Sequence, residues 1–399
     1  MSDLERFRSD VRAWLEQNAP AGLRGRPGSE LEGVWGGRKW QWENPDQRAW
    51  LERCAERGFS APSWPREYGG GGLSKDEAKV LGEELRRLAL PPPVIGFGLT
   101  MIGPTLLAFG NEAQKREHLP KICRGEIRWC QGYSEPGAGS DLAGLQTRAA
   151  DDGDHYLVNG TKVWTSYADK ADWIFALVRT DPNAKKQEGI TFLLIDMATP
   201  GVLVRPIKLI SGSSSFCETH FTDVRVPKKN VVHQVNAGWT VAKALLGHER
   251  TMVAEAFGSG GGAGGKRGTL SERAKHHLGS ENGRLADPIL RDQLAQLEMD
   301  TRAFSLTMQR ARDAAKAGHQ PGPESSIFKV YGTEVNMRRQ ELLVKIAGPQ
   351  GLGWEGPGFD PEELATTRDW LRSRGNSIEG GTSEVQRNVI AKRVLGLPD

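Results

Sequence analysis

A glycine-rich run in the first half of the chain could bring backbone N–H groups against a ligand. Residues 129–141 read WCQGYSEPGAGSD, and residues 162–166 read KVWTS. Gly137 and Gly139 allow a sharp turn and a close approach of the backbone, because glycine lacks the Cβ that would block it. Such a turn suits an acceptor-rich ligand, and the ring of Trp164 could cover one side of a flat cofactor. The alternative is a Ser/Gly-rich hairpin loop with a core tryptophan, and composition alone leaves both open.

Glu249, in the second half of the chain, is a candidate functional carboxylate. When residues 241–257 are projected as a helix at ~100° per residue, the apolar residues form one arc and Glu249 falls close to its centre. A carboxylate on an apolar face is costly unless it is paired or protonated, so such sites tend to be functional. The alternative is a glutamate that pairs with an arginine at the rim of a helical bundle.

Residues 129–166 resemble the first signature of the acyl-CoA dehydrogenase family, and residues 380–388, reading GGTSEVQRN, resemble the second. The two signatures lie far apart and in the family's order, and the resemblance extends over nearly the whole chain. It implies an FAD-dependent enzyme that oxidises an acyl-CoA thioester to the trans-2-enoyl-CoA and passes electrons to an electron-transfer flavoprotein. In that reaction a base takes the α-proton, and N5 of the flavin accepts the β-hydrogen as hydride.

The resemblance also bears on which residue is the base. In the family's most familiar members a glutamate stands directly before Gly-Thr in the second signature, but this chain has Gly380 there, which cannot act. Other members place the glutamate on a helix of the C-terminal domain, in a Glu-Arg pair that residues 245–251, reading LLGHERT, resemble. We therefore expect Glu249 to be the base, with Glu379, one position from the usual site, as the second choice.

The same resemblance assigns the other site residues. Those expected to line the flavin are Gln131, Tyr133, Ser134, Gly139, Ser140, Trp164, Thr165, Ser166, Thr382, Ser383 and Glu384. Those expected to border the acyl-CoA are Ser140, Gly247, His248, Arg250, Gly380 and Gly381. Thr382 or Ser383 is expected to cap the last helix, whose positive N-terminal end would then face phosphate or flavin.

A further segment bears on the assembly. Residues 345–351, reading KIAGPQG, resemble the segment through which a neighbouring subunit of the family holds the adenine half of FAD, and they add Lys345, Gly348 and Pro349 to the expected contacts. Pro349 replaces a glycine and removes a donor. An arginine that the family places before an aromatic-glycine pair is also missing. The expected assembly is a homotetramer, or a heterotetramer or dimer with a related subunit in which only some interfaces hold FAD.

Hydrophobic patterning predicts an α+β chain of three domains. Residues 1–126 show helical periodicity, and Ser74 with Glu77 forms a capping box before one of these helices. Residues 127–236 carry short β-branched and aromatic runs, typical of a small, mostly antiparallel β domain. Residues 237–399 return to helix and predict a domain like a four-helix bundle.

Three local predictions accompany this division. The dipeptide Asn159-Gly160 indicates a hairpin turn between two strands. In the C-terminal domain, apolar residues at alternating spacings of four and three, beginning at Leu290, predict the seam of a bundle. The pair His276-His277 is assigned to a basic loop.

The composition limits the classes of partner and the cell compartment that we expect for this chain. A net charge of +3, with acidic and basic residues interspersed, gives no reason to expect nucleic acid or an anionic membrane. No apolar run approaches the ~20 residues that a membrane span needs. Four cysteines without CxxC spacing, and histidines without a metal-binding pair, predict reduced thiols, a cytoplasmic location and no catalytic metal.

Two other functions remain open. A flavin-poor, non-catalytic partner subunit of a heteromeric dehydrogenase is suggested by Gly380 and by the altered segment 258–283. A flavoprotein of the same fold that reacts with oxygen, such as a monooxygenase or nitroalkane oxidase, is the other. The acyl group is not readable from the sequence, and branched, long, ring-bearing and dicarboxylic chains are all compatible with a base on the helix.

Overall fold

The computed structural model describes residues 2–25, 33–42, 44–246, 269–319, 322–359 and 361–398. The chain forms two compact units: unit 1 comprises Met1–Ile207 and Ser215–His248, and unit 2 comprises Lys208–Ser214 and Glu249–Asp399. The predicted base Glu249 and its neighbours Gly247, His248 and Arg250 lie outside the described residues. Their roles therefore stay predictions.

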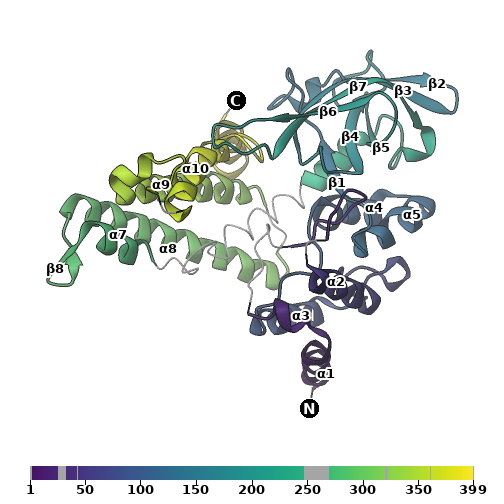
Figure 1. Ribbon diagram of the computed structural model, residues 1–399. Coiled ribbons are helices and arrows are strands. Elements are labelled where there is room, and N and C mark those ends of the chain that lie inside the picture. The colour runs from purple at the N-terminus through teal and green to yellow at the C-terminus, as the bar shows by residue number, and fades with distance from the viewer. Residues whose placement is uncertain are drawn as a thin grey trace. The chain divides into compact units, whose positions relative to one another are not determined.

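Unit 1 begins with helices, as predicted (Figure 1). These are α1 (Asp3–Asn18), α2 (Pro45–Arg57), α3 (Lys75–Arg87), α4 (Gly103–Phe109) and α5 (Glu112–Cys123), with short 3-10 turns at Ala21–Leu23 and Arg66–Tyr68 and a π turn at Gly98–Ile102. The predicted capping box is confirmed, because the Ser74 hydroxyl accepts the N–H of Glu77 and the Glu77 carboxylate accepts the N–H of Ser74. Helix α2 ends at Gly58, which takes the left-handed conformation that glycine adopts without strain.

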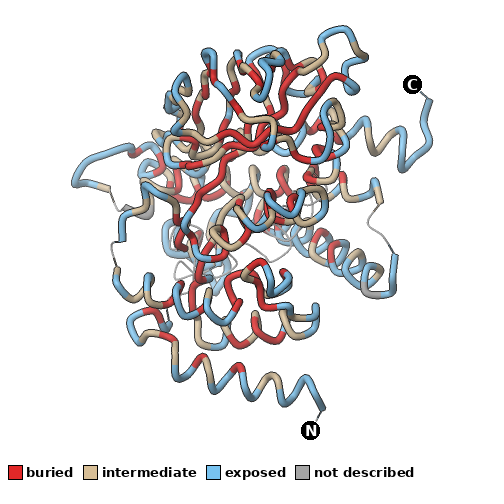
Figure 2. Tube along the Cα trace, turned by 90° about the vertical axis from the view of Figure 1, so that its right-hand side faces the viewer, coloured by how far each residue is buried: buried red, intermediate tan, exposed pale blue. Residues whose placement is uncertain are grey.

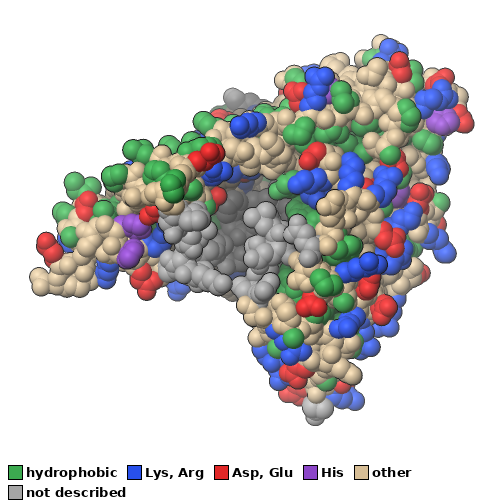
Figure 3. Space-filling model, in the orientation of Figure 1, with side chains coloured by type: hydrophobic (Ala, Val, Ile, Leu, Met, Phe, Trp, Pro, Cys, Tyr) green, Lys and Arg blue, Asp and Glu red, His purple; other side chains and the backbone are tan. Residues whose placement is uncertain are grey.

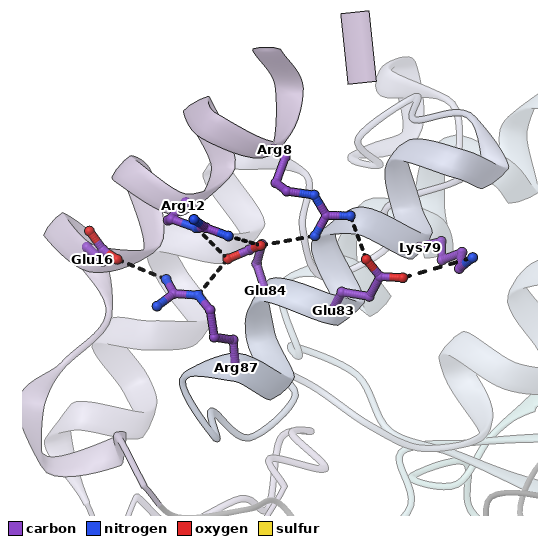
Figure 4. Close-up of polar contacts among 7 residues, drawn as sticks. All are labelled: Arg8, Arg12, Glu16, Lys79, Glu83, Glu84 and Arg87. Atoms are coloured by element: carbon purple, nitrogen blue, oxygen red, sulfur yellow. Dashed lines mark hydrogen bonds and ion pairs between the residues drawn. The ribbon is translucent and has the colours of Figure 1, made fainter. Parts of the chain in front are cut away.

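A buried carboxylate joins two of these helices. Glu84 on α3 is almost fully buried and accepts hydrogen bonds from Arg8 and Arg12 of α1 and from Arg87 of its own helix (Figure 4). A buried carboxylate is stable only when its charge is compensated and its oxygens are hydrogen-bonded. The three arginines therefore tie α1 to α3.

A seven-stranded sheet follows the helices of unit 1. Its strands are β1 (Trp129–Gly132), β2 (Arg148–Asp152), β3 (His155–Ser166), β4 (Trp173–Arg179), β5 (Ile190–Asp196), β6 (Val202–Ile207) and β7 (Phe216–Pro227). The sheet runs in the order β1-β4-β2-β3-β7-β6, with β5 paired to β4, and only the β1–β4 and β2–β4 pairs are parallel. The mostly antiparallel β domain is thus confirmed, and its buried residues follow the strands (Figure 2).

The predicted hairpin turn at Asn159-Gly160 is wrong. β3 runs through both residues, and the chain turns earlier, at Gly153 between β2 and β3. Gly160, at φ +150°, lies where the register between β3 and β7 shifts, which marks a β-bulge. A Cβ at this position would lie 2.6 Å from the hydroxyl of Thr147, so the glycine permits a close backbone approach rather than a turn.

Unit 2 is helical in its described part, apart from a small hairpin. Its elements are α7 (Leu270–Leu278), β8 (Ser280–Glu281), β9 (Arg284–Leu285), α8 (Pro288–Lys316), α9 (Ser325–Ala347), α10 (Pro361–Ser373) and α11 (Ser383–Val389), with 3-10 turns at Gly348–Leu352 and Arg374–Ser377 and a π turn at Ile390–Val394. The predicted seam is confirmed: one core cluster joins Leu290, Leu294 and Leu297 of α8 to Val335, Leu342 and Ile346 of α9.

Two further features of unit 2 differ from or refine the sequence analysis. The pair His276-His277 was predicted to lie in a loop, which is wrong, because both residues occupy the last turn of α7. Residues 280–285, which begin within the altered segment 258–283, form the β8–β9 hairpin with its turn at Asn282-Gly283.

Three features of the described residues concern charge, membranes and metals. Acidic and basic side chains are interspersed over the face of unit 1 that Figure 3 draws. Among the described helices, none combines the length and the apolar character that crossing a bilayer requires. In the same part of the chain, no group of three or more acidic, histidine or cysteine side chains is placed to hold a metal ion.

Candidate functional site

The most unusual residue of the first signature is Trp164, near the end of β3. Its φ is +59°, a left-handed conformation that is rare for a bulky side chain and costs about 1–3 kcal/mol. It lies in a second β-bulge: Lys162 pairs with Thr219 and Thr165 pairs with Cys217, so Val163 and Trp164 together face a single residue of β7. The indole is 55% exposed and touches Phe216 edge-on at 6.1 Å between centroids. A large flat ring is thus presented outward from the sheet.

Thr165 anchors the bulge on its C-terminal side. The side chain is fully buried, and its hydroxyl donates to the carbonyl of Cys217 at 2.8 Å and lies 2.9 Å from the hydroxyl of Thr219. Any contact of Thr165 with a ligand would therefore use its backbone, because the hydroxyl is engaged inside the sheet.

Lys162 anchors the bulge on its N-terminal side. Its side chain is 0% exposed, and its ammonium donates to the carbonyl of Tyr133 at 3.1 Å and to the carboxylate of Glu135 at 2.7 Å. Burial lowers the pKa of Lys162 to about 8, although Glu135 acts in the opposite direction. Burial by itself would raise the pKa of Glu135, but Lys162 and the hydrogen bonds at the carboxylate outweigh it, and the net pKa is lowered. The 2.7 Å contact between the two groups is that of an ion pair.

The glycine-rich turn itself is tight at its base and open at its tip. Glu135 and Ala138 exchange two backbone hydrogen bonds of 3.0 Å across the turn. Gly137 and Gly139 have no positive φ, and no described atom lies within 4 Å of a Cβ built on either. Nothing in the described protein therefore requires glycine at these positions, whereas a ligand that approaches the backbone would. Ser140, also predicted to line the site, is exposed beside them.

The remaining predicted residues of unit 1 face in different directions. Gln131 and Ser134 are half-buried at the end of β1 and just after it, and Ser166 is half-buried at the end of β3. The ring of Tyr133 is buried edge-on against Phe175 and Phe192, so it belongs to the core rather than to an open surface.

In unit 2 the second signature forms a glycine turn followed by a short helix. Gly380 and Gly381 have φ of +66° and +86°, and Thr382 caps α11 by accepting the N–H of Val385, as predicted. The hydroxyl of Ser383 is buried and has no hydrogen-bond partner among the described residues. Glu384 is exposed in the first turn, where hydrogen bonding to a backbone N–H lowers its pKa.

Glu379, the second-choice base, is engaged by its neighbours. One carboxylate oxygen accepts from Arg372 at 2.7 Å, and the other accepts from the side-chain amide of Asn376. The geometry of Glu379 is that of an ion pair on the surface of unit 2.

The segment predicted to reach the adenine half of FAD closes α9. Lys345 is in the last turn of α9 and pairs with Glu341 at 3.0 Å. Gly348 follows with φ +57°, and Pro349 lies in the 3-10 turn after it. These residues and the second signature belong to unit 2, whereas residues 131–166 belong to unit 1.

Three buried charged residues in or next to the first signature were not predicted as part of the site. They are Glu135, Lys162 and Arg179, which donates to the carbonyls of Ala143 and Leu145. The alternation of side chains along a strand could have indicated that one of them, Lys162, is buried. Lys162 lies an even number of residues from Tyr156 and Val158, so its side chain is on the same face of β3 as theirs, which face the core.

Comparison with known proteins covers nearly the entire chain. The model described as the N-terminal domain of acyl-CoA dehydrogenase matches residues 36–126, the middle-domain model matches residues 130–224, and the C-terminal-domain model matches residues 236–395. Acyl-CoA dehydrogenase IpdE1 of Mycobacterium tuberculosis is 37% identical over 404 residues, an alignment that covers 100% of this chain and 99% of the relative.

Two solved structures extend the comparison. The Tcur3481-Tcur3483 steroid ACAD is 32% identical with a TM-score of 0.74, and the match covers 99% of this chain and 97% of the other. The ChsE4-ChsE5 complex of Mycobacterium tuberculosis is 29% identical with a TM-score of 0.72, and the match covers 100% of this chain and 98% of the other.

Proposed function

The chain belongs to the acyl-CoA dehydrogenase family and is an acyl-CoA dehydrogenase, and from this premise we propose that it forms a trans-2-enoyl-CoA with Glu249 as the base. Members of the family typically bind FAD, which when bound accepts the β-hydrogen as hydride at N5. The residues of this chain then have three tasks: to hold the flavin, to orient the thioester, and to receive the α-proton at one carboxylate.

The observation that carries the FAD assignment is the outward-facing Trp164. A 55% exposed indole, held at a strained backbone position, suits an aromatic surface for the flavin better than a core residue. The open tip at Gly137 and Gly139 leaves room for a ligand against the backbone. In unit 2, the unpartnered hydroxyl of Ser383 is a further donor for the cofactor.

One feature weighs against Glu379 as the base, and another excludes the position that the family's familiar members use. Glu379 has both carboxylate oxygens engaged, by Arg372 and by Asn376. Position 380, which carries the base in the family's familiar members, is a glycine. Glu249 remains as the carboxylate that the sequence places at the centre of an apolar helix face, where the loss of solvation favours proton uptake.

The test is anaerobic bleaching of the flavin absorbance by a panel of acyl-CoAs, with Glu249→Gln and Glu379→Gln as a matched pair. General-base catalysis contributes roughly 10²–10⁴-fold. We expect Glu249→Gln to keep its FAD and to bleach at least a hundredfold more slowly, while Glu379→Gln stays within a few fold of the wild type. The reverse ranking would assign the base to Glu379, and a wild-type rate in both variants would overturn the proposed mechanism.

The proposed substrate and partners draw on the relatives. One of the similar structures is named a steroid ACAD, so we include ring-bearing, steroid-derived acyl-CoAs in the panel beside straight, branched and dicarboxylic ones. ChsE4 and ChsE5 form a complex, which supports a heteromeric assembly for this chain. An electron-transfer flavoprotein is proposed as the electron acceptor.

A non-catalytic partner subunit is the second candidate function, because Gly380 replaces the familiar base and the family's arginine is missing. The two candidates separate when the chain is purified alone. Protein that is yellow with FAD and bleaches with an acyl-CoA is the dehydrogenase by itself. Colourless protein that gains FAD and activity only with a second, related chain is a partner subunit. Rapid oxygen consumption without an enoyl product would instead indicate an oxygen-reacting flavoprotein.

A further inference from the structure

A fully buried lysine is an unusual element of a β-sheet, and Lys162 has no need to be charged for packing alone. Buried ion pairs can often be replaced by apolar residues of similar volume without loss of stability. What distinguishes the Lys162–Glu135 pair is the set of groups that it holds. Besides the ammonium, the Glu135 carboxylate accepts the backbone N–H of Gln146 at 2.6 Å and that of Thr147 at 2.9 Å.

These contacts join three separate segments of unit 1 through their backbones. Lys162 holds the carbonyl of Tyr133, directly before the glycine-rich turn. Alongside, the N–H of Val163 donates to the carbonyl of Ser134 at 2.9 Å. The turn is thus fixed to β3 on one side and to residues 146–147 on the other. Arg179 is the other charged group facing the pair, and it secures the intervening residues through the carbonyls of Ala143 and Leu145.

Trp164 stands two residues beyond Lys162, in the bulge. A bulky residue keeps a left-handed conformation only where its surroundings impose it. The indole is largely exposed and meets Phe216 edge-on, so we assign the constraint to the hydrogen bonds of the residues on either side. Lys162 supplies it before the bulge, and Thr165 supplies it after the bulge through Cys217 and Thr219.

We propose that Lys162 and Glu135 form a buried positioning pair, which holds the Trp164 bulge and the Tyr133–Ser134 segment side by side so that the flavin-facing surface of unit 1 is formed before FAD binds. Preorganisation of this kind raises affinity, because the ligand does not have to order the protein. The inference rests on FAD binding in the proposed function, and it assigns both residues a role in placing others rather than in touching the cofactor.

The test is FAD titration of the full-length apoprotein, followed by flavin fluorescence, together with the visible circular dichroism of the bound flavin. For Lys162→Met, which keeps the volume and removes the charge, we expect the FAD dissociation constant to rise at least tenfold. We also expect the dichroism of the remaining bound flavin to change, because the ring beside it is no longer fixed. Glu135→Gln removes the charge and leaves one amide oxygen where the carboxylate accepted Gln146 and Thr147 on different oxygens, so it should shift both readouts in the same direction.

Two control variants separate positioning from general loss of stability. Val158→Ala makes a cavity in the core on the same strand, and it should lower the unfolding midpoint but leave the dissociation constant within twofold. Lys228→Met removes an exposed lysine that pairs with Asp151 at 2.7 Å near the other end of β3, and it should change neither readout.

The outcomes distinguish this inference from the proposed function. If the wild type binds FAD, and Lys162→Met binds it within twofold with unchanged dichroism, the positioning role is refuted and FAD binding stands. If Lys162→Met does not fold, Glu135→Gln decides by the same criterion. The double variant Lys162→Met/Glu135→Gln should lose no more affinity than Lys162→Met alone, and additive losses would show that the two residues do not act as a pair. A wild-type chain that takes up no FAD, either alone or together with a related chain, refutes both proposals.

Discussion

The surroundings of the Glu84 carboxylate allow an estimate of how much the substitution Glu84→Gln should destabilise unit 1. Glu84 is 2% exposed and accepts from Arg12 at 2.8 and 3.0 Å, from Arg8 at 3.1 Å and from Arg87 at 2.7 Å (Figure 4). Removing one partner of a fully buried pair costs about 3–5 kcal/mol, whereas an exposed pair contributes about 0.2–1 kcal/mol. The three arginines are 37–46% exposed, so water screens them, and we expect a loss of about 2 kcal/mol.

Acid should remove the same stabilisation from the wild type. Hydrogen bonds, that from Arg12 foremost, lower the pKa of Glu84 from 4.5 to about 2, despite its burial. Because the folded pKa lies below the unfolded value, the contribution is complete above pH 4.5 and is lost as the pH falls towards 2. Urea unfolding at a series of pH values should therefore show the difference between the wild type and Glu84→Gln shrinking by more than half between pH 7 and pH 3.

Glu83→Gln is the matched control, because it changes the neighbouring residue on the same helix. Glu83 is 34% exposed and pairs with Arg8 at 2.6 Å and with Lys79 at 3.9 Å, so its loss should cost no more than about 0.5 kcal/mol. Equal costs for the two variants at pH 7, or a Glu84→Gln difference that does not depend on pH, would refute the argument from burial.

Two further predictions concern burial and backbone geometry. Burial raises the pKa of all four cysteine thiols, that of Cys123 to about 12. The native protein should therefore react slowly with a thiol reagent at pH 8, whereas all four thiols should react rapidly in denaturant. Rapid labelling of the native protein would contradict their burial. Gly160→Ala should lower the free energy of unfolding of unit 1, measured by urea unfolding, by about 3 kcal/mol. The new Cβ would lie 2.6–2.8 Å from Thr147, in a backbone conformation that L-residues rarely adopt. An unchanged stability would argue against the bulge.

Local chemistry accounts for the elements that the sequence predicts well. The capping box at Ser74 depends on residues within one turn and appears where expected, and the left-handed end of α2 at Gly58 has an equally local origin. The dipeptide Asn159-Gly160 carries an equally strong local signal for a turn, yet β7 pairs with β3 on both sides of it. A long-range pairing therefore overrides a short-range preference, and a single sequence does not contain that pairing in readable form.

In the candidate site, too, the sequence predicts some features and the tertiary structure determines others. Resemblance identifies the two signatures, but it does not say which side chains leave the core. Trp164 is exposed while its neighbour Thr165 is fully buried, and the bulge that separates their environments comes from the register of β3 against β7. Tyr133 is likewise in the core because its ring meets Phe175 and Phe192, two residues of other strands. Orientation follows from tertiary contacts, so it could be learned only from the structure.

The backbone around Gly380 bears on why the base would lie elsewhere in the chain. Gly380 adopts φ +66°, where an L-residue loses about 1–2 kcal/mol, and Gly381 follows at +86°. The amide of Gln386 donates to the carbonyl of Gly380 at 3.1 Å and so helps to hold the turn in this form. A glutamate introduced at position 380 would be strained where it stands or would have to alter the turn that precedes α11. A base at Glu249, as proposed, would avoid this strain.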